Sequence, residues 1–96
     1  MLDSLQVTDD LMRLQITWSD GSKSELAAQV LRQEARDAHS IRFRIDHGDL
    51  VAAEDLKITA LAQVGAAAVN VHFSDGHDRA IYPFVYLKEL SERFDN

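Results

Sequence analysis

Residues 73–76 read FSDG and end a run of alternating apolar and polar residues, and residues 18–21 read WSDG and end another such run. Alternation with a period of two is typical of a strand with one buried face. Asp followed by Gly is favoured in tight hairpin turns, because Asp bonds to nearby backbone N–H groups and Gly accepts a positive φ. Each turn is followed by a short polar stretch and then by an amphipathic segment. The repeat therefore predicts two similar halves, each a hairpin followed by a helix.

The strands of the first half follow from the residues around the WSDG turn. Apolar and polar residues alternate over residues 12–18 and predict a strand. We expect residues 5–7 to pair with it as a first hairpin, and a return strand over residues 22–26 to pair with it after the turn.

Four further strands are predicted in the rest of the chain. Two flank the FSDG turn, over residues 69–73 and from the turn to about residue 82. A third is predicted over residues 41–45, where Ile, Phe and Ile alternate with charged residues. The longest alternating run covers residues 56–64, and we expect it to be a central strand.

Helical spacing of apolar residues occurs at two places. The first predicts a helix over about residues 27–36, with one side formed by Ala27, Val30, Leu31 and Ala35. The second predicts a helix over about residues 83–94, with a buried stripe of Phe84, Leu87, Leu90 and Phe94. Pro83 suits the first position of that helix, where its missing N–H removes no bond. The fold class is therefore α+β, with antiparallel hairpins and two helices over one face of the sheet.

Composition limits the size of the fold and the classes of partner. The 96 residues are 46% hydrophobic and 27% charged, as expected for one domain that spans residues 1–96. Ten basic against sixteen acidic residues give a net charge of −6, and the basic residues are scattered. Nucleic acid is therefore not expected as a partner, because phosphate binding needs clustered Lys and Arg.

Location and redox chemistry follow from what the sequence lacks. There is no cysteine, which excludes disulfides, thiolate zinc ligands and thiol nucleophiles. No stretch approaches the ~20 apolar residues of a membrane span, and the first residues do not resemble a secretory leader. We expect a cytoplasmic protein that binds no membrane and needs no cofactor.

Acidic and histidine side chains are the candidates for chemistry. Asp20 and Asp75 both precede glycine, and two carboxylates are able to do acid–base work, but turn structure alone explains both. The four histidines lack the spacing of a zinc site. A facial triad for non-haem iron, formed by His72, His77 and Asp75, is not expected, because His72 and His77 lie on opposite sides of a tight turn. No catalytic residues are predicted, and we do not expect an enzyme.

The second turn and the last helix supply a candidate interaction surface. Tyr86 lies off the apolar stripe of that helix, so we expect its hydroxyl at the surface, where Tyr often marks a binding patch. The candidate surface comprises Asp75, His77, Tyr82 and Tyr86. Alanine at Tyr86 is then expected to weaken a partner and to leave stability nearly unchanged.

Residues 71–90, VHFSDGHDRAIYPFVYLKEL, resemble the DUF971 family, the domain found at the N-terminus of gamma-butyrobetaine hydroxylase. Residues 14–32 look like the other half of that domain, so the resemblance covers nearly the whole chain. In the family's hydroxylases the domain precedes an Fe(II)/2-oxoglutarate dioxygenase domain and carries zinc held by three cysteines and a histidine. The cysteine positions fall here on Ala35, Asp37 and Ser40, and only the histidine is retained, as His77. The resemblance thus implies that the zinc site is lost.

The resemblance implies an accessory role, since the same domain also occurs fused to Mrp-type ATPases that handle iron–sulfur clusters. Our first hypothesis is a non-enzymatic protein-interaction module linked to iron–sulfur or Fe-enzyme systems, a monomer or weak homodimer whose partner is another protein. The alternative is a zinc- or iron-binding protein that uses His77 with Asp37 or His39. A third is a small enzyme or dioxygenase fragment.

Overall fold

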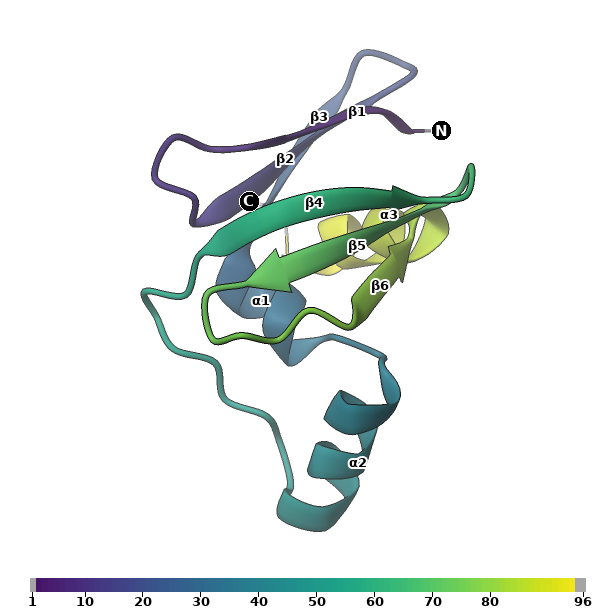
Figure 1. The fold of residues 1–96 in the computed structure, drawn as a ribbon. Helices are drawn as coiled ribbons and strands as arrows, with labels where there is room; N and C mark the ends of the chain where they lie inside the picture. Colours follow the sequence, from purple (N-terminus) through teal and green to yellow (C-terminus); the bar gives the residue numbers. More distant parts are fainter. Residues whose placement is uncertain (1, 95–96) are drawn as a thin grey trace.

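The computed structural model describes residues 2–94, and within them the chain forms two antiparallel three-stranded sheets and three helices (Figure 1). The α+β class predicted from the sequence is confirmed. No helix among these residues has the length and apolar character needed to cross a membrane.

The first sheet contains β1 (Leu2–Val7), β2 (Arg13–Trp18) and β3 (Lys23–Ala27), in the order β1-β2-β3. The second contains β4 (Ile58–Val64), β5 (Ala68–Phe73) and β6 (Ala80–Pro83), in the order β4-β5-β6. All strand pairs are antiparallel. The first predicted turn connects β2 to β3 within the first sheet, and the second connects β5 to β6 within the second sheet. β1 and β4 each form one edge of a sheet.

The two Asp-Gly turns have the same geometry. Gly21 has φ +87° and Gly76 has φ +88°, the left-handed region that favours glycine. The carboxylate of the preceding Asp accepts the backbone N–H two residues on, at 2.9 Å in both turns, from Ser22 to Asp20 and from His77 to Asp75. The repeat read from the sequence is therefore present in three dimensions, because the same local bonds form twice.

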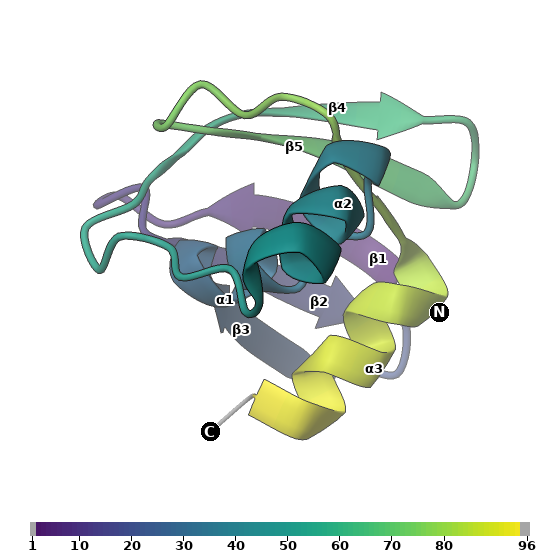
Figure 2. The ribbon, with the colours of Figure 1, turned by 90° about the horizontal axis from the view of Figure 1, so that it is seen from below.

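The helices are α1 (Ala28–Gln33), α2 (Ala38–His47) and α3 (Phe84–Phe94). α1 follows β3 directly and α3 follows β6 directly, as the two-halves prediction requires. Both predicted helices are somewhat shorter than expected, and Pro83 is the last residue of β6, immediately before α3. Figure 2 shows α2 and α3 from below the sheets.

The core is built from the inward faces of both sheets and from α1 and α3. Its largest side chains include Trp18, which is 4% exposed, together with Leu14, Ile16, Leu31, Ile58, Val71, Phe73, Tyr82, Leu87 and Leu90. The indole N–H of Trp18 donates to the Ser24 hydroxyl at 2.9 Å, so the ring is buried without an unpaired donor. Phe94, expected in the apolar stripe, is 38% exposed near the end of α3.

The prediction of a strand over residues 41–45 is wrong, because these residues lie within α2. The alternating apolar residues do not mark a buried face: Ile41 is 42% exposed and Ile45 is 74% exposed. The helix begins after Asp37, whose carboxylate accepts the backbone N–H of Ser40 at 3.1 Å. This is an N-cap, which favours a helix over an extended strand.

The run at residues 56–64 is an edge strand, β4, and not the central strand that we expected. The pairing with β5 shifts register between Ile58 and Ala60. A bulge of this kind reverses which residues point inward. Ile58 is buried, but Ala60 and Ala62, which continue the same alternation, are exposed and Leu61 packs against the core instead. The central strand of this sheet is β5.

Candidate functional site

The second Asp-Gly turn lies against the junction between α1 and α2, and a cation from α1 connects them. Arg32 Nε donates to Asp75 Oδ2 at 3.0 Å, and Arg32 Nη1 donates to Ser40 Oγ at 3.0 Å. The Arg32 side chain is only 10% exposed, so its charge is held by these partners more than by water. The Arg32 guanidinium thus connects the turn to α2. Asp75 in the turn is 43 residues from Arg32 in the sequence, and Ser40 in α2 is 8 residues from it.

A second connection joins the same segments. His77 Nε2 lies 2.9 Å from Asp37 Oδ1, and the two side chains are 9% and 7% exposed. Asp37 Oδ1 also accepts the Ser40 hydroxyl at 2.8 Å, and the His77 backbone N–H donates to Asp75 Oδ1. The hydrogen bonds therefore close into a ring, which we call the polar network: Arg32, Asp37, Ser40, Asp75 and His77.

The network keeps both of its carboxylates ionised. Burial raises the pKa of Asp37, but hydrogen bonds from His77 and Ser40 outweigh it, and the pKa lies below its ordinary value. Burial also raises the pKa of Asp75, and this is outweighed by the His77 backbone N–H and by the Arg32 guanidinium, so its pKa is lowered too. At neutral pH the network contains two carboxylate anions and one guanidinium cation.

The structure separates the four residues of the predicted interaction surface into two pairs. Asp75 and His77 belong to the polar network, whereas Tyr82 and Tyr86 are buried, at 0% and 5% exposure. The Tyr82 hydroxyl donates to the Leu31 carbonyl, and the Tyr86 hydroxyl donates to the Glu34 carbonyl at 2.6 Å. Burial raises the pKa of both phenols.

The expectation that the Tyr86 hydroxyl lies at the surface is therefore wrong. The buried side of α3 is wider than a single stripe and includes Tyr86, Leu87, Leu90 and Ser91. The Tyr86 ring stacks on Tyr82 with centroids 6.3 Å apart, and the Arg36 guanidinium lies 3.6 Å from its ring centroid. The signal in the sequence was the four-residue spacing from Tyr86 to Leu90, which places both on one face of a helix.

The residues at the positions that correspond to the zinc ligands of the family's hydroxylases do not fit a zinc site. Asp37 and His77 bond to each other, Ser40 bonds to Asp37 and to Arg32, and Ala35 supplies no donor atom. A guanidinium cation occupies the position next to these groups, and it would repel a metal cation. Within residues 2–94 no group of three or more His, Asp or Glu side chains is placed to hold a metal.

His39, the other proposed ligand, lies beside the network and not in it. Its ring centroid is 6.0 Å from that of His77. Together with residues 76–79 it lines a shallow hollow of about 320 Å³ on the outer side of the second turn. His77 is the member of the network that borders this hollow.

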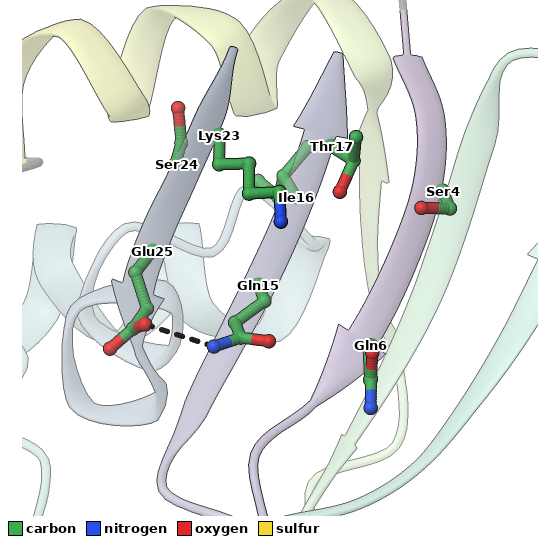
Figure 3. A pocket seen from close by; sticks show the side chains of 8 residues that line it. All are labelled: Ser4, Gln6, Gln15, Ile16, Thr17, Lys23, Ser24 and Glu25. Carbon is green, nitrogen blue, oxygen red and sulfur yellow. Dashed lines mark hydrogen bonds between the residues drawn. The ribbon is translucent and has the colours of Figure 1, made fainter. Parts of the chain in front are cut away.

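A further hollow, of about 340 Å³, lies on the first sheet and is shown in Figure 3. Its lining side chains come from β1, β2 and β3 and are mostly polar. The Gln15 side-chain amide donates to Glu25 Oε2 at 3.2 Å across two neighbouring strands. These are ordinary cross-strand pairs of a solvated sheet face, and they offer no acid, base or nucleophile in a buried setting.

Fold and network together define a small α+β domain whose two hairpin-plus-helix halves are joined through a polar network. The chain belongs to the family described as "Gamma-butyrobetaine hydroxylase-like, N-terminal", whose model matches residues 5–88. The family resemblance read from the sequence is thereby confirmed.

Solved structures agree with this assignment. A crystal structure of a protein of unknown function from Acidithiobacillus ferrooxidans ATCC 23270, described as belonging to the DUF971 family, is similar with a TM-score of 0.74 and 26% identity, over 94% of this chain and 91% of that one. A protein structure determined by NMR in solution is similar with a TM-score of 0.72 and 26% identity, over 96% of this chain and 69% of that one. No curated protein matches the chain.

Proposed function

We propose that this chain is a non-enzymatic protein-interaction module that binds its partner through α2. The observation that supports this proposal is the exposure of apolar side chains on that helix. Ile41 is 42% exposed and Ile45 is 74% exposed, and their four-residue spacing places them on one face. Val51, in the segment that follows, is 83% exposed. Exposed apolar residues grouped on one element are typical of an interaction surface.

The position of α2 also supports the proposal. Figure 1 shows that α2 extends away from the two sheets. Its first turn is held by the polar network through Asp37 and Ser40. Further along the helix, the Arg44 guanidinium donates to the carbonyl of Gln33, the last residue of α1, and to that of Ala35 in the segment that follows. A helix that is already fixed loses little conformational entropy on binding, and an apolar helix face fits a groove in a partner.

The family name suggests the class of partner. It describes the N-terminal part of proteins like gamma-butyrobetaine hydroxylase, so the domain accompanies an enzyme. We propose that the partner is a protein of an iron-enzyme or iron–sulfur system. The alternative of a metal-binding protein using His77 with Asp37 or His39 receives no support from the geometry, since Asp37 and His77 bond to one another.

The test is a comparison of matched surface variants in affinity purification from cells of the source organism. Ile45→Glu places a charge on the proposed surface, and Phe94→Glu places the same charge on α3 at a residue that is 38% exposed. We expect an iron-enzyme or iron–sulfur protein to copurify with the parent chain and with Phe94→Glu. Its affinity for Ile45→Glu should fall at least about tenfold, the effect of losing about 1.4 kcal/mol.

Thermal melting of both variants serves as the control for folding. Neither substitution should lower the melting temperature substantially, because both side chains are exposed. The proposal is wrong if the parent chain recovers no reproducible partner, or if Ile45→Glu binds the partner as tightly as the parent does.

A further inference from the structure

A groove separates the two sheets where their edge strands lie beside one another. The loop that joins β1 to β2 contacts the start of β4, where the Ile58 N–H donates to the Leu11 carbonyl at 2.7 Å. Each edge strand is paired on one side, β1 with β2 and β4 with β5, and no strand pairing joins the two within the described part of the chain. A register shift in each strand bends it and accounts for the separation.

The groove lies along residues 2–5 of β1, and both apolar and polar side chains line it. It encloses about 410 Å³, with Leu2 and Leu5 on the β1 side, Leu61 and Gln63 on the β4 side, and Val69 and Phe84 between them. Asp3 is the charged residue along this part. Both walls are strand edges, and every second residue of an edge directs its N–H and C=O away from the neighbouring strand. Such edges are ready to pair with another extended chain.

The groove continues at its open end into a second, more apolar hollow of about 310 Å³. The two hollows share Leu2, Ala66 and Phe84, and the second is also lined by Trp18 and Val85. Its one charged lining residue is Lys88, whose ammonium lies 4.9 Å from the centroid of the Trp18 ring. A cation at the end of an apolar hollow, in a chain of net charge −6, is complementary to an anionic group that arrives with an apolar side chain.

We infer that an extended peptide with an apolar C-terminal residue binds between β1 and β4. Its backbone pairs with a strand edge, its last side chain enters the hollow beside Trp18 and Phe84, and its terminal carboxylate meets Lys88. Since Lys88 lies at the Leu2 end of β1, the bound peptide runs antiparallel to β1 and parallel to β4. This surface is distinct from α2, so the inference goes beyond the proposed function and does not depend on it.

The experiment is an NMR titration of the isotope-labelled full chain with four hexapeptides. Two are N-acetylated, alternate Val and Thr and end in Leu, one with a free carboxylate and one with an amide. The third replaces the central residues with Pro, which cannot pair in a strand. The fourth ends in Ser in place of Leu. We expect the free-acid Leu peptide to shift amide signals of β1, β4 and the start of α3, and to bind at least about tenfold more tightly than the other three.

Two variants test the role of the cation. In Lys88→Gln the preference for the acid over the amide should disappear, and in Lys88→Arg it should remain. The inference is overturned if none of the peptides shifts these signals at about 1 mM, if acid and amide bind equally to the parent chain, or if the shifts fall on α2. Concentration-dependent shifts of β1 and β4 without peptide would place a second copy of the chain in the groove and also overturn it. Loss of partner binding in Ile45→Glu leaves all of these outcomes unaffected, so the two proposals fail separately.

Discussion

At the scale of single residues, Ser22 and His77 occupy equivalent positions in the two halves of the repeat but make different side-chain contacts. Ser22 and His77 each follow an Asp-Gly turn, and each donates its backbone N–H to the turn carboxylate. The Ser22 side chain bonds locally, to Asp20 at 2.6 Å. The longer His77 side chain reaches Asp37, 40 residues away. The structural repeat is local, whereas the contact that distinguishes the halves is tertiary.

Tyr86 provides a prediction at this scale that reverses the one drawn from the sequence. Because the side chain is buried, Tyr86→Ala should lower the free energy of unfolding by about 3–5 kcal/mol, as for other buried aromatic residues. Tyr86→Phe keeps the ring and loses only the hydrogen bond to the Glu34 carbonyl, which is worth about 1 kcal/mol. Urea denaturation measures both. An alanine variant as stable as the parent would place the side chain at the surface after all.

At the scale of elements, α2 was misread because two signals competed. Alternation over residues 41–45 favours a strand, but it rests on three apolar residues, all of which are at least 38% exposed in the structure. Asp37 and Ser40 are spaced as an N-cap residue and its third helical position, a start signal for a helix. The N-cap predicts the structure of this segment correctly, since it depends on hydrogen bonds within four residues and not on a buried face.

The cap also yields a prediction about α2. Asp37→Ala removes the N-cap and the bond to His77, so amide exchange in α2 should accelerate relative to β5. A cap is worth about 0.5–2 kcal/mol, which corresponds to roughly 2- to 30-fold in exchange rate. Asp37→Asn, in contrast, retains a capping side chain and loses only the charge, and its effect on α2 should be smaller. Hydrogen exchange followed by mass spectrometry measures this, and equal protection of α2 in all three proteins would contradict it.

At the scale of the whole molecule, the network ties α1, α2 and the β5–β6 turn into one unit, and its carboxylates link stability to pH. The pKa values of Asp37 and Asp75 are lowered in the folded protein. Groups of this kind stabilise the fold fully above their unfolded pKa, close to 4, and the stabilisation is lost as the pH falls through the lower folded value. The protein should therefore become less stable as the pH drops below about 4.

The measurement is the melting temperature between neutral pH and about pH 2. Asp75→Asn should be less stable than the parent at neutral pH and should lose less on acidification, because one of the two linked carboxylates is gone. Asp49→Asn, which changes an exposed carboxylate outside the network, provides the matched control. A parent chain with the same acid dependence as Asp75→Asn would show that the network does not couple to folding.

Turn chemistry, strand alternation and the spacing of apolar residues were readable from the chain alone, and they were enough for the α+β class, both Asp-Gly hairpins and the helices that follow them. These features depend on bonds between residues close in sequence and on the sorting of apolar side chains towards the core. Only the tertiary structure showed the polar network, the burial of Tyr82 and Tyr86, and the edge position of β4. The network and the two buried tyrosines depend on contacts between segments 40 or more residues apart, and the edge position of β4 depends on how the strands of the second sheet are ordered. Local propensities do not encode such contacts, because they arise from the packing of the whole molecule.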